Sequence, residues 1–224
     1  MNKNGYLITL EGGEGSGKTV VGQDLRDHLI SLGLPVEYYR EPGTTRIGEQ
    51  IRKVVLSPDN HEISSKTEAL LFQAARAQFC EQLLWPALKE GKVVISDRFT
   101  DSSKAYQGWA RGLGKERIAE LNRWSTDDLI PDLSLFFDVK VETGLQRRDN
   151  SSEGDRLDKM EIEFHRKVRE GYLDAIREDK TGRWGVIDAN QELQVVRREA
   201  ILVAEERLSV AGFIERSKGK LERR

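Results

Sequence analysis

The chain of 224 residues is long enough for one sizeable domain or two small ones, and its 38% hydrophobic and 33% charged residues are typical of a globular protein with a full core. This composition excludes a disordered chain, and no apolar stretch reaches the roughly 20 residues that a membrane-spanning helix requires. The net charge of -2 argues against a protein that binds nucleic acid through bulk electrostatics.

Two features of the sequence concern the cellular compartment. The N-terminal MNKNG lacks the apolar segment of a signal peptide, and the single cysteine, Cys80, has no partner for an internal disulfide. We therefore expect the protein to work in the cytoplasm, which is a reducing compartment.

Short apolar runs rich in β-branched residues recur along the chain and predict five strands. They occupy residues 6–10, 36–40, 92–96, 133–138 and 184–188. Longer segments with helical periodicity separate them, such as residues 67–91, which end at Gly91. This alternation predicts an α/β fold with a five-stranded parallel β-sheet flanked by helices on both faces. The near-continuous apolar character of the strands suggests that both of their sides are buried.

The sequence shows no internal repeat and no linker rich in proline, glycine or serine. We expect a single domain over residues 1–213, followed by a C-terminal tail over residues 214–224. This tail contains the basic sequence SKGKLERR, which we interpret as solvated or frayed. Ligands of parallel α/β sheets bind at the carboxyl ends of the strands, so the residues after each strand are the candidates for a site.

The first predicted strand leads into EGGEGSGKT, residues 11–19, which contains the full P-loop pattern from Gly12 to Thr19. Its glycines allow backbone N–H groups to surround phosphate oxygens, and the following helix adds its positive N-terminal dipole. Lys18 is expected to neutralise β- and γ-phosphate charge, and the Thr19 hydroxyl to bind Mg²⁺. A chance match is disfavoured by the preceding strand and the following helix. The expected ATP-binding residues are Gly12, Gly13, Glu14, Gly15, Ser16, Gly17, Lys18 and Thr19.

The second strand ends in the turn sequence REPG, and a helical segment over residues 46–55 follows. Arg52 lies on this predicted helix, where it is either a phosphate ligand or a solvated arginine. The third strand ends in Asp97 and Arg98. Asp97 is placed to hold Mg²⁺ through water, and Arg98 offers a planar fork to a phosphate. Alternatively, Asp97 and Arg98 pair with each other.

The fourth strand ends at Asp138, and a polar segment with arginines at positions 147, 148 and 156 follows. In a nucleotide enzyme, residues 147–158 suit a lid that closes over the transferring phosphoryl group. The alternative is an exposed loop with a charged rim.

Arginines outside the P-loop, at positions 40, 52, 76 and 98, supply more positive charge than one triphosphate needs. They favour a kinase with a second phosphorylated substrate, such as a nucleoside monophosphate. A GTPase would need a guanine-reading Asn-Lys-x-Asp segment, which the sequence lacks.

The sequence resembles the thymidylate kinases. The matching segments follow the family's order over most of residues 6–190, and they are EGGEGSGKT, REPGTT with EQIR, ALLFQAARA, DRFTDSSKAYQG, PDLSLFFDV, GDRLD and IDAN. The resemblance implies the P-loop kinase fold with a short lid segment and Mg²⁺-dependent transfer of a phosphoryl group from ATP to dTMP. It also implies a homodimer in the cytoplasm.

The resemblance assigns the remaining substrate contacts. Phe72 would stack on the thymine ring, although it is also compatible with a core position, and Arg76 would donate to a thymine carbonyl. Arg98 and Arg52 would hold the dTMP phosphate. The remaining expected contacts are Gln107 to the pyrimidine edge, Tyr106 against the sugar, and Ser102 and Ser103 as nearby polar groups.

Glu14 is unusual in a phosphate-binding loop because its carboxylate repels phosphate. The resemblance implies that it faces the acceptor, where it accepts a hydrogen bond from the dTMP 3′-hydroxyl and pairs with an arginine. The alternative is an exposed acid.

The lid departs from the family pattern. Where related bacterial sequences carry spaced arginines, residues 149–153 read DNSSE, and Asp158 takes the place of a glutamate. The expected catalytic residues are Lys18, Arg98 and Arg148, with Arg147 or Arg156 as alternatives for the lid arginine. This thinned lid leaves open a catalytically weak nucleotide-binding homologue, and a kinase of dUMP or a modified pyrimidine monophosphate is a further alternative.

Overall fold

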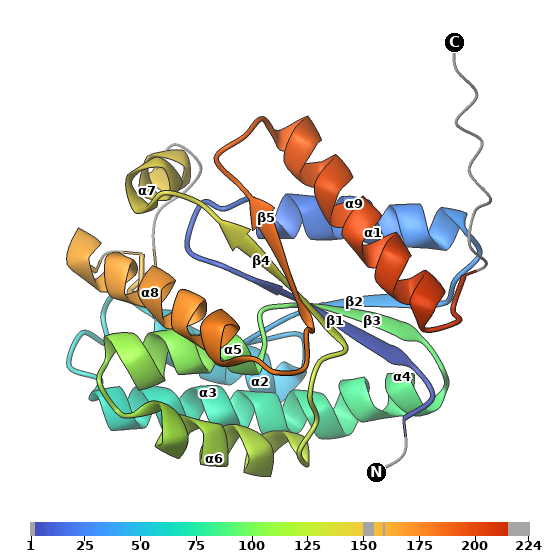
Figure 1. Cartoon of the computed structure of the whole chain (residues 1–224). Helices are drawn as coiled ribbons and strands as arrows, with labels where there is room; N and C mark the ends of the chain where they lie inside the picture. Colours follow the sequence, from blue (N-terminus) through green and yellow to red (C-terminus); the bar gives the residue numbers. More distant parts are fainter. Residues whose placement is uncertain (1–2, 150–154, 159, 215–224) are drawn as a thin grey trace.

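The computed structural model describes residues 3–149, 155–158 and 160–214. Its centre is a five-stranded parallel sheet in the order β2-β3-β1-β4-β5 (Figure 1). The strands are β1 (Tyr6–Glu11), β2 (Val36–Arg40), β3 (Val93–Asp97), β4 (Leu133–Asp138) and β5 (Trp184–Asp188). The predicted fold class and all five predicted strands are confirmed, each within one residue at either end.

Helices cover both faces of this sheet (Figure 1). One face carries α1 (Lys18–Ser31) and α9 (Leu193–Val210), and the other carries α3 (Ser65–Phe79), α4 (Trp85–Lys89), α5 (Thr100–Ser103), α6 (Lys115–Thr126) and α8 (Ile162–Glu178). Two π-helical segments, η1 (Cys80–Leu84) and η2 (Lys104–Ala110), continue α3 into α4 and extend α5. The helix predicted over residues 67–91 is therefore present, as α3, η1 and α4 in succession.

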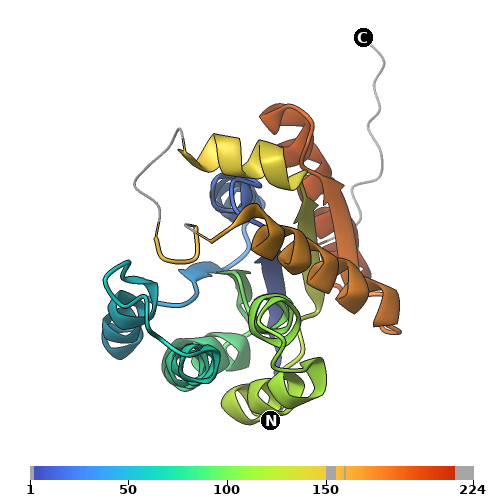
Figure 2. The same ribbon diagram turned by 90° about the vertical axis from the view of Figure 1, so that its left-hand side faces the viewer.

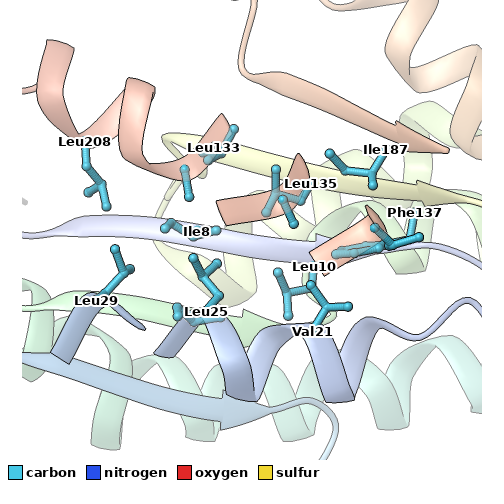
Figure 3. Close-up of a cluster of buried hydrophobic side chains, with 14 of the residues drawn as sticks. Ile8, Leu10, Val21, Leu25, Leu29, Leu133, Leu135, Phe137, Ile187 and Leu208 are labelled. Carbon is cyan, nitrogen blue, oxygen red and sulfur yellow. The ribbon is translucent and has the colours of Figure 1, made fainter. Parts of the chain in front are cut away.

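The strand side chains alternate between two hydrophobic layers. Ile8 and Leu10 of β1 face α1, where they pack with Leu25 (Figure 3). Leu7 belongs instead to the layer around α4. β1, β3 and β4 are buried on both faces except at the last residue of β4. The edge strands are not, since no residue of β2 is fully buried and Val186 of β5 is 50% exposed. The expected two-sided burial therefore holds for the three central strands only.

Figure 2 looks onto the carboxyl ends of the strands. The loop after β1, the turn before α2 (Arg46–Leu56), the turn after β3 and helix α7 (Val141–Asp149) meet at this edge. In the described part of the chain, no helix is long and apolar enough to cross a bilayer. Residues 150–154 of the predicted lid and residues 215–224 of the predicted tail lie outside the described ranges.

Candidate functional site

A cavity of about 340 Å³ lies at the carboxyl ends of the strands. This volume falls in the range of small-molecule sites, and several elements that are distant in sequence contribute to its walls. Among the predicted site residues, its lining includes Glu14, Gly15, Ser16, Gly17, Lys18, Thr19, Arg52, Phe72, Arg76, Asp97, Arg98, Ser102, Ser103, Tyr106, Gln107 and Arg148. The remaining two, Gly12 and Gly13, lie next to it and contribute backbone carbonyls to Arg98 and Lys18.

The loop after β1 has the geometry of an anion cradle. Gly17 is the N-cap of α1 with a φ of 85°, and no side chain caps this helix, so the N–H groups of its first turn can bind an anion. The Nζ of Lys18 lies 2.6 Å from the carbonyl oxygen of Gly13 and 3.0 Å from the Ser16 hydroxyl. Burial and the nearby Arg98 lower the pKa of Lys18 to about 8, which keeps most of the ammonium charged at neutral pH.

Two glycines allow α7 to pack directly against this loop. A Cβ on Gly15, whose φ is 64°, would lie 1.9 Å from the carbonyl oxygen of Gly144. A Cβ on Gly144 would in turn lie 2.3 Å from the carbonyl oxygen of Glu14. Helix α7, which leads into the predicted lid, is therefore in backbone contact with the P-loop.

Arg98 and Glu14 form an ion pair across the cavity wall. The Arg98 Nη2 donates to Glu14 Oε1 at 2.6 Å, and its Nη1 donates to the Gly12 carbonyl at 3.0 Å. Tyr106 donates to the same Glu14 oxygen at 2.7 Å and places its ring 5.1 Å from the Arg98 guanidinium. Burial alone would raise the pKa of Glu14, but Arg98, Lys18 and Tyr106 lower it to about 2. The expected pairing of Glu14 with an arginine is confirmed, and the alternative of an exposed acid is wrong, since its side chain is 18% exposed.

The backbone conformation of Arg98 directs its side chain toward Glu14. The φ of 71° at Arg98 lies in the left-handed region, which costs energy for a residue other than glycine and is common at functional sites. This turn directs the side chains of Arg98 and its neighbour Asp97 to different partners. Arg98 forms its ion pair with Glu14. Among the described residues, Asp97 accepts hydrogen bonds from Thr19 and Tyr38. The alternative in which Asp97 and Arg98 pair with each other is therefore wrong.

Thr19 and Asp97 bring two oxygen groups to the start of α1. The Thr19 hydroxyl donates to Asp97 Oδ2 at 2.6 Å, and Tyr38 donates to the same oxygen at 3.2 Å. Within the described ranges, no group of three or more His, Cys, Asp or Glu side chains could hold a metal ion. A hydroxyl and one carboxylate fit Mg²⁺, because this ion keeps several waters and takes further oxygens from substrate phosphates.

Sequence reasoning missed a second acid beside the loop, Glu11. It is fully buried at the end of β1 and accepts from the Phe99 backbone N–H, the Ser102 hydroxyl and the Tyr172 hydroxyl. Burial and the nearby Asp101 raise the pKa of Glu11 to about 7. The signal in the sequence was an acid at the end of an otherwise apolar strand.

Three side chains occupy the side of the cavity toward α3. Phe72 is 9% exposed and belongs both to the cavity lining and to a core cluster with Tyr106, so its position is compatible with either expected role. Arg76 is buried and donates to Glu41 at 2.9 Å, to Ser103 at 2.8 Å and to the backbone. Gln107 is buried and donates its Nε2 to Glu68 at 2.9 Å.

The ion pair of Arg76 with Glu41 was not foreseen. Both side chains are almost inaccessible, at 3% and 2%, and burial raises the pKa of Glu41 despite the nearby arginine. Glu41 sits in the REPG turn, where the sequence indicated only the end of a strand. No local pattern could have joined it to a helix 35 residues away.

The three arginines of the predicted lid make different contacts. Arg148 lines the cavity, where it is ion-paired with Asp158 at 2.7 Å. Arg147 instead donates to the Ala189 carbonyl, and Arg156 is buried against Glu68 and the Val55 carbonyl. Arg52, on α2, lines the cavity and donates to the Pro42 carbonyl, and burial lowers its pKa.

Comparisons with known proteins agree with this site. The family model for thymidylate kinase matches residues 10–200. The thymidylate kinase of Bacillus velezensis is 44% identical over 207 residues, covering 92% of this chain and 97% of that protein. The thymidylate kinase of Clostridium novyi is 46% identical over 201 residues, covering 89% and 97%.

A solved structure has the same fold. The crystal structure of thymidylate kinase from Ehrlichia chaffeensis superposes with a TM-score of 0.72 at 30% identity, covering 89% of this chain and 98% of that one. The matches in sequence and in structure each span nearly the whole domain that carries the cavity. The chain belongs to the thymidylate kinase family.

Proposed function

We propose that this protein transfers the γ-phosphoryl group of ATP to dTMP, giving ADP and dTDP. The observation that carries the proposal is one continuous cavity that joins the P-loop to a second group of cationic side chains, Arg52, Arg76 and Arg98. A site for one triphosphate needs only the loop and Lys18. The additional arginines suit a second phosphorylated substrate placed opposite the γ-phosphate.

Positioning and charge neutralisation supply the rate in such a transfer. Lys18, Arg98 and Arg148 line the same cavity, so their charges can surround a phosphoryl group that moves between the two substrates. An acceptor phosphate is already ionised at neutral pH, and no general base is needed. Thr19 and Asp97 would hold Mg²⁺, which would supply positive charge that neutralises part of the phosphate charge of ATP.

Arg76 and Phe72 fit the base of the acceptor. A guanidinium has five N–H groups. Within the described structure, the Arg76 guanidinium uses its Nε and both Nη1 hydrogens on Glu41, Ser103 and Asn122. One Nη2 hydrogen goes to the Phe99 carbonyl, which leaves the second Nη2 hydrogen for a carbonyl of thymine. The Phe72 ring supplies an apolar wall on which a pyrimidine can stack.

Glu14 and Tyr106 fit the deoxyribose. Glu14 is ionised throughout the neutral range and can accept a further hydrogen bond from a 3′-hydroxyl group. Tyr106 is held against Glu14 by its own hydroxyl, and its ring would limit the room for a ribose 2′-hydroxyl. Ser102 and Ser103 contribute indirectly, since their hydroxyls contact Glu11 and Arg76.

The direct test is an assay of ADP release with ATP, Mg²⁺ and a panel of nucleoside monophosphates. We expect turnover with dTMP that stops when EDTA removes the metal and returns when Mg²⁺ is added. Turnover restricted to AMP or GMP would contradict the proposal. ATP binding without turnover on any acceptor would favour the catalytically weak homologue.

We further propose that the protein is a cytoplasmic homodimer. Leu70 on α3 and Trp124 on α6 are 56% and 82% exposed, and apolar side chains of this size on adjacent helices favour association. Sedimentation equilibrium should give twice the monomer mass of 25.5 kDa. A concentration-independent monomer would contradict the dimer and leave the proposed reaction intact.

A further inference from the structure

A buried carboxylate that none of the assigned roles includes lies behind the cavity. Glu68 is in the first turn of α3, and its side chain has no exposed surface. It accepts hydrogen bonds from Gln107 of η2, from Arg111 and from Arg156. A residue of α3 thus joins η2 to Arg156 of the predicted lid segment.

The two oxygens of Glu68 are used differently. Oε1 accepts from Gln107 Nε2 at 2.9 Å and from Arg111 Nε at 3.2 Å. Oε2 accepts from Arg111 Nη2 at 2.9 Å and from Arg156 Nη2 at 2.6 Å. Burial alone would raise the pKa of Glu68, but these donors together lower it, so the carboxylate stays ionised and can only accept.

An acceptor in this place determines which way the Gln107 amide points. The oxygen and nitrogen of an amide are nearly equal in size, so neighbouring donors and acceptors choose between the two orientations. Ionised Glu68 attracts the Gln107 nitrogen and repels its oxygen. Gln107 lines the cavity, and it can therefore present its Oε1 and its second Nε2 hydrogen there.

This pattern discriminates between pyrimidines. The Watson–Crick edge of thymine has a donor at N3 between two carbonyl acceptors, whereas cytosine has an acceptor at N3 beside an amino donor. An amide that presents an oxygen with a neighbouring N–H is complementary to thymine, and the reversed amide is complementary to cytosine. We infer that Glu68 is a specificity-determining positioning residue, which selects thymine over cytosine by fixing the orientation of the Gln107 amide. The inference rests on the proposed function, because it takes Gln107 to face the acceptor base.

The substitution Glu68→Gln tests this inference. The two arginines can only donate, so the single oxygen of the introduced amide is drawn to the Oε2 position that they share. Its NH₂ group then faces Gln107, which must turn its own oxygen toward it. We expect kcat/KM to fall for dTMP and to rise for dCMP. The ratio of kcat/KM for dTMP to kcat/KM for dCMP should therefore fall by about 10- to 100-fold.

A charge-balanced variant distinguishes a change in specificity from a loss of folding. Glu68→Gln leaves the buried Arg156 and the half-buried Arg111 without a carboxylate, whereas the double variant Glu68→Gln/Arg111→Met keeps the original net charge of this cluster. The double variant also removes the Arg111 Nε–H, which would otherwise meet the introduced NH₂ group. Arg111→Met alone is the matched control, because it preserves the bond from Gln107 to Glu68, and its substrate ratio should equal that of the wild type.

The outcomes separate this inference from the proposed function. A lowered ratio in either Glu68 variant, with an unchanged ratio in Arg111→Met, supports the inference. Equal losses on dTMP and dCMP in variants that unfold cooperatively would overturn it and make Glu68 a structural residue only. A wild-type protein that does not prefer dTMP to dCMP would instead contradict the proposed function.

Discussion

The carboxylate of Glu14 lies 2.6 Å from the guanidinium of Arg98, and this pair connects the P-loop to the end of β3. It places an acid of the nucleotide loop at the boundary between the two proposed substrates. We therefore expect the loop to take part in acceptor binding as well as in ATP binding.

Replacing Glu14 by glutamine should affect the acceptor more than ATP. Arg98 would lose its charged partner and the 3′-hydroxyl its acceptor, so we expect the KM for dTMP to rise by about 10- to 100-fold. The KM for ATP should change by less than about threefold, since the backbone N–H groups of the loop are unaffected. Steady-state kinetics with each substrate varied in turn measures both values, and equal increases in the two KM values would contradict this assignment.

Replacing Arg76 by alanine should destabilise the fold as well as raise the KM for dTMP. Glu41 would remain buried without its arginine, which typically costs about 3–5 kcal/mol. Arg52→Ala should lower the free energy of unfolding by much less, because Arg52 lines the same cavity but is less buried. Urea unfolding of both variants gives the comparison, and similar free energies of unfolding would show that the Arg76–Glu41 pair contributes little.

Among the lid arginines, Arg148→Ala should lower kcat the most. Loss of a charge-stabilising group near a transferring phosphoryl typically costs on the order of 10²–10³ in rate. Arg147 points away toward the Ala189 carbonyl, so Arg147→Ala is the matched control and should lower kcat by less than about fivefold. Single-turnover measurements isolate the chemical step, and equal effects of the two variants would remove Arg148 from the catalytic residues.

Glu11→Gln should change how stability depends on pH. The folded-state pKa of Glu11 is raised to about 7, so its contribution is fully present below an unfolded value near 4.5 and is lost as the pH rises through 7. The glutamine variant does not ionise. Its free energy of unfolding relative to the wild type should therefore increase between pH 5 and 8, by on the order of 2–3 kcal/mol. Urea unfolding at several pH values measures the difference, and a constant difference would contradict the raised pKa.

The sequence by itself determined the features that depend on neighbours along the chain. Strand positions followed from short β-branched runs, the P-loop from glycine spacing, and the start of α1 from Gly17. These depend on backbone conformation and on local hydrophobic periodicity, which a few consecutive residues specify.

Only the tertiary structure decided which charged side chains meet. Arg98 and Glu14 are 84 residues apart, and Arg156 and Glu68 are 88 apart. Glu68, three residues after Ser65, reads locally as a helix-capping acid, yet the packing of α3 against η2 buries it beneath Gln107. A buried carboxylate must find donors wherever the fold brings them, because leaving it unpaired costs several kcal/mol. Which charged side chains pair is therefore decided by how the helices and strands pack, and no local pattern in the sequence encodes it.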